Sequence, residues 1–590
     1  MIGAAFANAN GLALGSRNGV VVAASVSITL AILAGLVALP LSHLLAFAAQ
    51  RPGVRRLLGE GGVTLHLVAF ASFGFVQAAR RLAGLRLSAA AAAGLGILAA
   101  LLAAALLSRF PSRWFRLGLA AVALGLLAIG TLFGWRWPGA PPMPPAGLVG
   151  RPREPLLVVA FDGLSHDTLE RLVARGDLPT FGSLMRTGAW GPLQTLKPTL
   201  SPILWTTIAT GRRAEDHGIL GFKGGYLLPG VSTPLLRLPP GPGGGASTLY
   251  QILRAGLAMG VVREAALASD QWQAPPIWSI ASSAGLRVAA INWWASWPAE
   301  SVNGVVVTDR FYPVAQSLGA LPPGLVHPDA RAEGLRALLV RPEQLSPQAV
   351  ETFVRGGSVR ERPQLDTTRP LHVFRDTAPR ESLALAFHVA DLTHQAIAEH
   401  LLAEATWDLL LVYFRGVDVV SHLMGGVSNL HGGIATDRAA ADRFGHTLEA
   451  YYRVADSQLG ALLARVPAGT NVLVCSDHGF AWDSPEKYSH LKSSPPGVFL
   501  LSGPAAAQGQ GVSAGILDLA PAMLYLLGLP VARDMPGRVP EAALRRGLVG
   551  AHPVERIDTY QGLRRAPESR RVLPIAPEVE EELKALGYVG

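Results

Sequence analysis

Residues 156–163 read LLVVAFDG, and this stretch decides the fold class. Its first six residues, Leu156–Phe161, are all apolar, which is typical of a strand buried on both faces of a parallel sheet. Similar runs recur at Val288–Ile291, Leu409–Phe414, Asn471–Cys475 and Gly497–Leu501. Because helical patterns lie between these runs, we expect an α/β sandwich with a mostly parallel central sheet.

Polar side chains follow these strands, at the edge where open α/β sheets bind ligands. An aspartate follows the first run, an aspartate and a histidine four residues apart follow LLLVYF, and an adjacent Asp–His pair follows NVLVC. Together with a histidine before the last run, the set is Asp162, Asp418, His422, Asp477, His478 and His490. A single aspartate after a strand is ordinarily a helix cap or a turn residue. Six carboxylates and imidazoles together suit zinc, and they are enough for two divalent ions.

The stretch 199–211, TLSPILWTTIATG, contains a candidate nucleophile. Ser201 stands directly before Pro202, in a position to start a helix, so its ordinary interpretation is an N-cap residue. A serine at a helix N-terminus beside two divalent ions is also suited to nucleophilic attack. A cation lowers the pKa of the hydroxyl, and the helix N-terminus favours an incoming anion. These residues alone leave both interpretations open.

Five motifs occur in order along the chain: AFDG, TLSPILWTTIATGRRAEDHGI, GVDVVSH, SDHG and a later histidine before GVFLLSGP. This series resembles the alkaline phosphatase superfamily and, within it, the type I phosphodiesterase/nucleotide pyrophosphatase branch. The resemblance covers residues 155–220 and 405–535 and is weak over 223–400. It implies an alkaline-phosphatase-like α/β/α catalytic domain over 156–590, with an inserted lobe at about 223–400.

The resemblance also implies how the candidate residues divide between two zinc ions. One ion would be held by Asp162, Ser201, Asp477 and His478. The other would be held by Asp418, His422 and His490. Ser201 would be the nucleophile and form a phosphoserine intermediate, although the branch usually carries threonine there, with proline two residues later. Thr199 is therefore a second candidate nucleophile, and His217 is expected to be structural.

The activity implied by the resemblance is hydrolysis of phosphate esters, with phosphodiester or nucleotide-type substrates favoured. Asn292 and Trp293 follow a predicted strand and are candidates for lining the substrate pocket. A membrane enzyme that transfers phosphoethanolamine or phosphoglycerol to lipid is the main alternative. A sulfatase is less expected, because the residues after Ser201 lack the C/S-x-P-x-R pattern. A membrane-tethered binding module without metals would normally have lost ligands, and none of the six is missing.

The N-terminal region has the composition of a membrane domain. Residues 1–136 contain apolar runs that predict about four transmembrane helices, because roughly 20 apolar residues cross a bilayer. The runs are Val20–Ala49, Val63–Ala79, Leu87–Leu107 and Leu117–Trp135. Residues 137–155 are rich in proline and predict a stiff linker. We therefore expect a multi-pass protein of the cell membrane, in contact with the lipid bilayer, whose catalytic domain is extracytoplasmic.

Charge and cysteine content narrow the possible functions further. Residues 1–135 contain ten arginines and one acidic residue, which accounts for the whole formal net charge of +9. The rest of the chain is neutral overall, so we expect no binding of nucleic-acid polymers. The single cysteine, Cys475, excludes internal disulfides and a Cys-rich zinc module.

Overall fold

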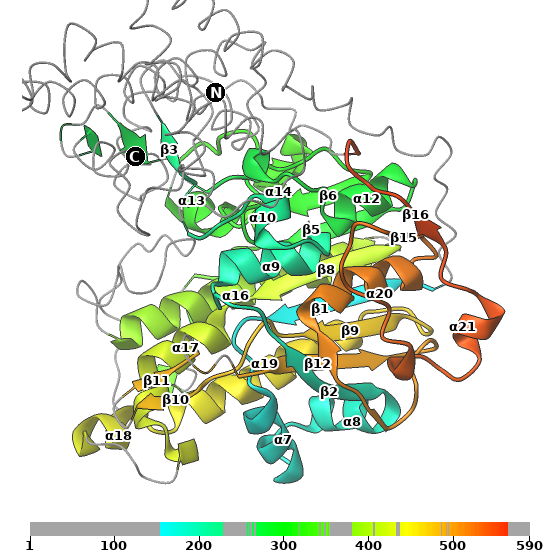
Figure 1. The fold of residues 1–590 in the computed structure, drawn as a ribbon. Helices are drawn as coiled ribbons and strands as arrows, with labels where there is room; N and C mark the ends of the chain where they lie inside the picture. The colour runs from blue at the N-terminus through cyan, green and yellow to red at the C-terminus, as the bar shows by residue number, and fades with distance from the viewer. Residues whose placement is uncertain are drawn as a thin grey trace, which may run out of the picture. The chain divides into compact units, whose positions relative to one another are not determined.

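The computed structural model describes residues 154–563, apart from 228–255, 354–379 and several shorter gaps. A ten-stranded sheet forms the centre of this part of the chain (Figure 1). Its strand order is β13-β2-β12-β9-β1-β8-β5-β6-β7, and β14 pairs with β2. The strands are β1 (Leu156–Phe161), β2 (Ala189–Gln194), β5 (Val288–Ile291), β6 (Gly304–Val307), β7 (Val326–His327), β8 (Leu409–Phe414), β9 (Asn471–Cys475), β12 (Gly497–Ser502), β13 (Gln510–Gly511) and β14 (Ala514–Gly515).

The middle of the sheet is parallel and is built on β1. Strands β9, β1, β8, β5 and β6 run parallel, whereas β12 is antiparallel to both β9 and β2, and β7 is antiparallel to β6. In register, Phe161 pairs with Phe414 and Ala160 with Cys475, so the carboxyl ends of β1, β8 and β9 lie at one edge. All five strands expected from apolar runs are present in the sheet, and the expected α/β architecture is confirmed.

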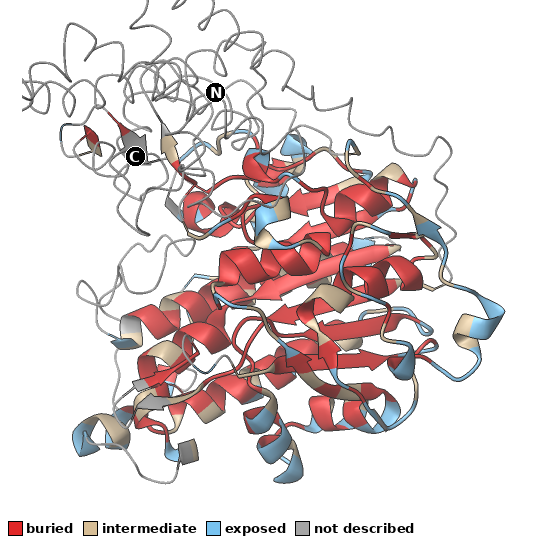
Figure 2. Ribbon diagram, in the orientation of Figure 1, coloured by how far each residue is buried: buried red, intermediate tan, exposed pale blue. Residues whose placement is uncertain are grey.

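Helices cover both faces of the sheet because β1 is apolar on both sides. Alternate residues of β1 belong to two separate hydrophobic cores, and Figure 2 shows the central strands as buried. The first core packs against α7 (His166–Ala174), α8 (Pro179–Thr187), α16 (Arg380–Glu404), α17 (Gly416–Met424) and α19 (Thr447–Leu463). The second core packs against α9 (Ser201–Thr210), α12 (Ile277–Ser283) and α20 (Leu519–Leu526).

Short elements connect these layers. Three small strand pairs are β3 (Tyr226–Leu227) with β4 (Arg263–Glu264), β10 (Ala481–Ser484) with β11 (Lys487–Ser489), and β15 (Val531–Ala532) with β16 (Arg556–Ile557). The remaining helices with described bounds are α10 (Ala214–His217), α13 (Phe311–Ser317), α14 (Ala332–Arg336), α18 (Arg438–Phe444) and α21 (Leu548–Ala551). The hairpin of β10 and β11 matters for the site, because His490 directly follows it.

The expected inserted lobe needs a correction. Strands β5, β6 and β7 fall within 223–400, yet they extend the central sheet beyond β8. Residues 288–327 therefore contribute to the sheet, and they are not a lobe added outside it. The apolar run of β5 had signalled this, whereas β7 is only two residues long and carries no sequence pattern.

The expected membrane helices and most of the linker lie outside the described residues. Within the described part of the chain, no helix is long and apolar enough to cross a bilayer.

Candidate active site

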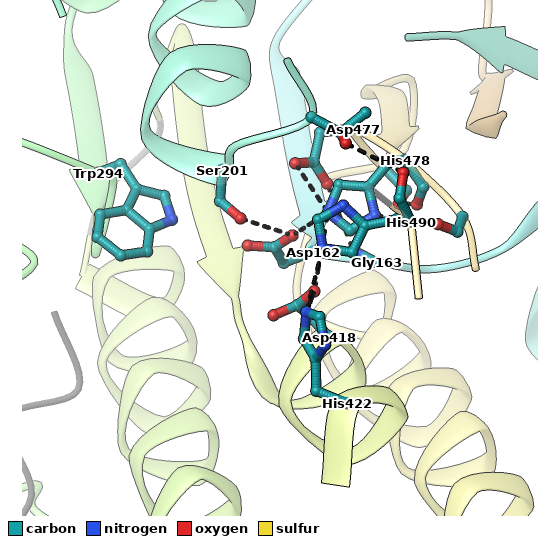
Figure 3. Close-up of polar contacts among 12 residues, drawn as sticks. Asp162, Gly163, Ser201, Trp294, Asp418, His422, Asp477, His478 and His490 are labelled. Carbon is teal, nitrogen blue, oxygen red and sulfur yellow. Dashed lines mark hydrogen bonds and ion pairs between the residues drawn. The ribbon is translucent and has the colours of Figure 1, made fainter. Parts of the chain in front are cut away.

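Three strand ends bring the six predicted side chains together. Asp162 directly follows β1, where its N–H donates to the Phe414 carbonyl oxygen over 2.9 Å. Asp418 and His422 lie four residues apart on α17 after β8, so they share one face of that helix. The Asp477–His478 pair follows β9, and the loop after β11 supplies His490. Figure 3 shows these side chains pointing toward a common point.

The ligand atoms form two overlapping groups. The first comprises Asp162, Asp418 and His478, and the second comprises Asp418, His422 and His490; within each group the atoms lie within 4.8 Å of one another. The Nε2 atom of His478 lies 3.4 Å from Asp162 Oδ1 and 3.6 Å from Asp477 Oδ2. Asp418 therefore belongs to both groups, whereas the resemblance assigned it to one ion alone.

Unsatisfied atoms in this cluster fit divalent cations. Four buried ligand atoms lack a hydrogen-bond partner among the described residues: Asp418 Oδ1, Asp477 Oδ2, His478 Nε2 and His490 Nδ1. Buried polar atoms are rarely left without a partner, because the desolvation cost is then not recovered. The Nε2 atoms of His422 and His490 also face each other at 3.1 Å. Mixed carboxylate and imidazole donors suit zinc and related transition metals, so the residues present fit such ions.

The charges of the cluster are balanced by bound protons when no cation is present. Burial raises the pKa of Asp418 to about 7, and the charge of Asp162 adds to the rise. Burial also opposes ionisation of Asp162, but the neighbouring imidazolium of His478 brings the pKa of Asp162 down to about 2. Burial disfavours the imidazolium of His478, yet Asp477 and Asp162 raise its pKa to about 10. A divalent cation bound here would displace such protons, because ligands bind metals in their deprotonated forms.

Ser201 is the first residue of α9 and faces this cluster. Its Oγ lies 3.5 Å from Asp162 Oδ1, and the residue is 6% exposed. Leu200 occupies the N-cap position and the Ser201 side chain makes no capping bond, so the ordinary interpretation of Ser201 as an N-cap is wrong. The residue stands at a helix N-terminus, where peptide N–H groups favour anions.

Thr199 and His217 have other partners. The Thr199 hydroxyl donates to the His490 carbonyl oxygen over 3.0 Å, which ties α9 to the loop that carries that histidine. The Nε2 of His217 is 3.1 Å from the Thr207 hydroxyl, and its Nδ1 accepts from the Ile219 N–H over 3.2 Å. His217 is thus held by its own segment, in keeping with the structural role expected for it.

Gly163 allows the close approach of β1 to α17. Its φ is +70°, and a Cβ at this position would lie 2.8 Å from the Cα of Asp418. Its N–H also donates to Asp477 Oδ1 over 3.3 Å. A side chain here would push apart the two segments that carry candidate ligands, which explains the glycine of the AFDG motif.

The substrate-pocket residues need a correction. Trp293 is fully buried and its indole N–H donates to the Trp205 carbonyl oxygen over 2.9 Å, so it packs in the core. Asn292 does line a cavity, and the next tryptophan, Trp294, lies beside it. Sequence reasoning could not separate two adjacent tryptophans after one strand, because the turn there decides which of them points inward.

Tyr413 and Arg415 flank the end of β8, and neither is among the site residues predicted from the sequence. The Tyr413 hydroxyl donates to Asp162 Oδ2 and accepts a hydrogen bond from Trp294 Nε1 over 2.7 Å. Burial raises the pKa of Tyr413 well above its usual value, so the phenol keeps its proton as a donor. Arg415 is buried, with its guanidinium 4.6 Å from the centre of the Trp294 ring. In the sequence, only their position at the end of a buried strand could have pointed to these two residues.

Comparison with known protein families identifies a family model that matches this chain. The family model described as type I phosphodiesterase / nucleotide pyrophosphatase matches residues 156–493, which is more than half of the chain. No curated protein matches the chain.

Similar solved structures include the murine and human ectonucleotide pyrophosphatase/phosphodiesterase 5. The murine protein is 15% identical, covers 66% of this chain and 100% of its own, and has a TM-score of 0.34. The human protein is 14% identical, covers 67% of this chain and 100% of its own, and has a TM-score of 0.36. Phosphonoacetate hydrolase from Sinorhizobium meliloti 1021 is 18% identical, covers 56% of this chain and 57% of its own, and has a TM-score of 0.30. On the family match, the chain is a hydrolase that belongs to the type I phosphodiesterase/nucleotide pyrophosphatase family of the alkaline phosphatase superfamily.

Proposed function

We propose that this protein hydrolyses phosphate esters with the help of two divalent cations, and that Ser201 is its nucleophile. One observation carries the proposal: the Ser201 hydroxyl lies 3.5 Å from Asp162, at the edge of a buried cluster of carboxylates and imidazoles with unsatisfied ligand atoms. The family match supports a phosphoric ester as the substrate, with a diester or nucleotide-type ester favoured.

The donor chemistry supports zinc as the resident ion. One ion would be held by Asp162, Asp477 and His478, with Ser201 beside it, and the other by Asp418, His422 and His490. When bound, such ions lower the pKa of a nearby hydroxyl and offset the charge that develops on phosphate oxygens.

The residues of the chain do the remaining work. Asp162 orients the Ser201 hydroxyl, and Tyr413 holds Asp162 from its other oxygen. Ser201 Oγ then forms a bond to phosphorus while the bond from phosphorus to the leaving oxygen breaks, and the hydroxyl proton passes to that leaving oxygen. The N-terminus of α9 stabilises the phosphoryl anion on Ser201. Water next attacks the phosphoserine, which frees phosphate, or a phosphate monoester from a diester, and restores the serine hydroxyl.

The test uses the full-length chain with chromogenic phosphate monoesters, phosphodiesters and a sulfate ester. We expect hydrolysis of a phosphate ester that stops after treatment with a chelator and returns on addition of zinc or manganese. A parallel reaction with a lipid head-group acceptor distinguishes hydrolysis from transfer, because a transferase would release leaving group without free phosphate. Turnover that is unaffected by chelation, or of the sulfate ester alone, would refute the proposal.

We also infer that residues 1–136 anchor the protein in the cell membrane, with the catalytic part outside the cytoplasm. The support is the length and composition of the apolar runs, together with arginines in the gaps between them. The loops at 50–62 and 108–116 hold six arginines against five on the other side, which favours these loops as cytoplasmic and the catalytic part as extracytoplasmic. A reporter fused after residue 150 tests this orientation directly.

A further inference from the structure

A small cavity with both polar and aromatic wall residues lies beside the candidate active site. Tyr413 forms part of its wall, and the same side chain bonds to Asp162. In the view of Figure 3, Ser201 lies between Trp294, another wall residue, and the imidazoles. The cavity holds about 20 Å³, enough for one water molecule or one oxygen of a bound group but not for an aromatic base.

A buried cation forms one side of this cavity. Arg415 is 6% exposed, and its guanidinium lies 4.6 Å from the centre of the Trp294 ring and 5.2 Å from that of Phe387. Stacking on aromatic rings fixes the plane of a guanidinium, and a planar, always charged group matches the oxygens of carboxylates and phosphates. The other arginines near the motifs lie elsewhere: Arg212, for example, pairs with Asp216 and Asp534.

An imidazole on the wall of the cavity has no hydrogen-bond partner among the described residues. His394 of α16 is 1% exposed and lines the cavity, yet neither of its ring nitrogens has a hydrogen-bond partner among the described residues. Burial lowers the pKa of His394 to about 3, so the imidazole is neutral and offers one N–H donor. A buried imidazole without partners is costly unless a ligand or water bonds to it.

The two carboxylates on the wall are engaged by the chain itself. Asp391 accepts from the backbone N–H groups of Arg415 and Gly416, over 3.1 and 2.9 Å, and from the Tyr451 hydroxyl. Asp309 accepts from the backbone N–H groups of Ala295 and Trp297, over 2.9 and 3.2 Å. These bonds anchor the two walls of the cavity.

The loop after β5 is held in a strained form at the cavity. Asn292 has a φ of 61° and Ala295 a φ of 55°, a region that residues other than glycine rarely adopt. This turn lets the Asn292 side chain reach the Tyr413 carbonyl oxygen over 3.1 Å and places Trp294 under Arg415. Such conformations persist where surrounding contacts hold them, and they are frequent at ligand sites.

The geometry points to a recognition site for a second anionic group of the substrate. Arg415, with His394, binds one oxygen of a carboxylate or phosphate that the substrate carries apart from the reacting phosphoryl group, and the rest of that group lies outside the cavity. This inference rests on the proposed function and deepens it, because it assigns the enzyme to substrates with two anionic groups. Arg415 would be a specificity-determining residue. Its loss should lower the preference for substrates with a second anionic group more than it lowers the turnover of substrates without one.

The test compares matched esters whose leaving phenol carries hydrogen, carboxylate or phosphonate in the para position, as phosphate monoesters and as methyl diesters. We expect the wild-type, full-length chain to prefer the charged leaving groups by at least about tenfold in kcat/KM. Arg415→Met should reduce this preference to about one, and Arg415→Lys should retain part of it. His394→Leu should weaken it without removing a charge. Arg212→Met is the matched control, and it should keep the full preference.

Binding gives a second readout that needs no turnover. Calorimetry with 4-carboxyphenylphosphonate and phenylphosphonate should show the same preference, and Arg415→Met should abolish it. If neither ester series is hydrolysed, the proposed function is wrong. Calorimetry then still tests whether the cavity binds an anionic group. A preference below about threefold in wild type, or one that survives Arg415→Met, overturns the inference. A difference between the carboxylate and phosphonate probes identifies which anion the site takes.

Discussion

Thr199 and Ser201 carry the same functional group two residues apart, but their surroundings differ. Thr199 is 1% exposed and its hydroxyl donates to a backbone carbonyl, whereas the Ser201 hydroxyl faces Asp162 in the metal-ligand cluster. Side-chain chemistry alone could not separate these two candidates. Their positions relative to α9 do, because the helix begins at Ser201 and presents that residue to the strand ends.

Substitution of these hydroxyls gives a direct test at the level of single residues. Ser201→Ala should reduce kcat by about a thousandfold or more, because a covalent step is lost. Ser201→Thr should keep much of the activity, since it retains a hydroxyl. Thr199→Ser is the control and should behave like wild type, because it preserves the hydrogen bond to the His490 carbonyl oxygen. Full activity in Ser201→Ala would contradict the assignment.

The sequence predicted the six ligand candidates because each is tied to the end of a recognisable strand. Tyr413, Arg415 and His394 could not be predicted in the same way, because their roles arise from contacts between segments far apart in the chain. Tyr413 matters through Asp162, 251 residues away. Trp293 was wrongly placed in the pocket because its orientation depends on a left-handed turn that begins at Asn292.

At the scale of elements, α17 is the helix whose placement matters most, since it carries Asp418 and His422. Its first turn is held by Asp391 of α16, which accepts from two successive backbone N–H groups. Tyr451 of α19 donates to the same carboxylate over 3.1 Å. Three helices thus converge at Gly416, the first residue of α17.

Gly416→Ala should disturb this junction, because the new Cβ would overlap the Tyr451 hydroxyl and the Asp391 carboxylate. We expect a loss of stability of about 1–3 kcal/mol and weaker zinc binding by the chelator-stripped chain, measured by thermal unfolding and calorimetry. Gly426→Ala is the matched control, because a Cβ there meets no atom within 4 Å. Adding Tyr451→Phe to Gly416→Ala should restore part of the lost stability, because it removes the hydroxyl that the new Cβ overlaps. Equal stability of the two single variants would refute this account.

The Asp391 carboxyl also predicts a pH dependence. Burial raises the pKa of Asp391 to about 7, against its hydrogen bonds, whereas the unfolded chain has the usual value near 3.8. Between these values the folded protein holds a proton that the unfolded chain does not, so this group's contribution to stability falls as pH rises toward 7 and is level above it.

Denaturant unfolding of the metal-free chain at pH 5, 6, 7 and 8 would measure this effect. The stability of Asp391→Asn relative to wild type should rise between pH 5 and 7, by up to about 1.4 kcal/mol per pH unit, and then level off. Using the difference between the two proteins cancels the titration of the other groups. Parallel pH profiles would show that Asp391 does not titrate in this range.

At the scale of the whole molecule, long strands were predictable and edge strands were not. The five apolar runs identify the middle of the sheet because burial on both faces leaves a continuous hydrophobic signal. Strands β7, β13 and β14 are two residues each, and their pairing is decided by neighbours that the local sequence does not reveal. For the same reason, part of the segment expected to be an insertion proved to belong to the sheet.

The proposed membrane anchor makes a prediction at this scale. The full-length chain should sediment with membranes and resist extraction by alkaline carbonate, because apolar spans are not held by charge. Removal of residues 1–136 should release the protein into the soluble fraction. A reporter that is active only outside the cytoplasm should work when fused after residue 150. Extraction of the full-length chain by carbonate would refute the anchor, and an inactive reporter would reverse the orientation.

Cys475 ends β9, paired with Ala160 of β1 and Phe499 of β12, and it is fully buried. Since the chain contains no other sulfhydryl, an alkylating reagent can react with the native protein only when these central strands separate. The rate at which Cys475 is alkylated therefore measures how often these strands separate in the native protein. Because Asp477 is two residues away, zinc should lower the alkylation rate of Cys475. The size of this decrease would measure how strongly the bound ion stabilises the strands against opening.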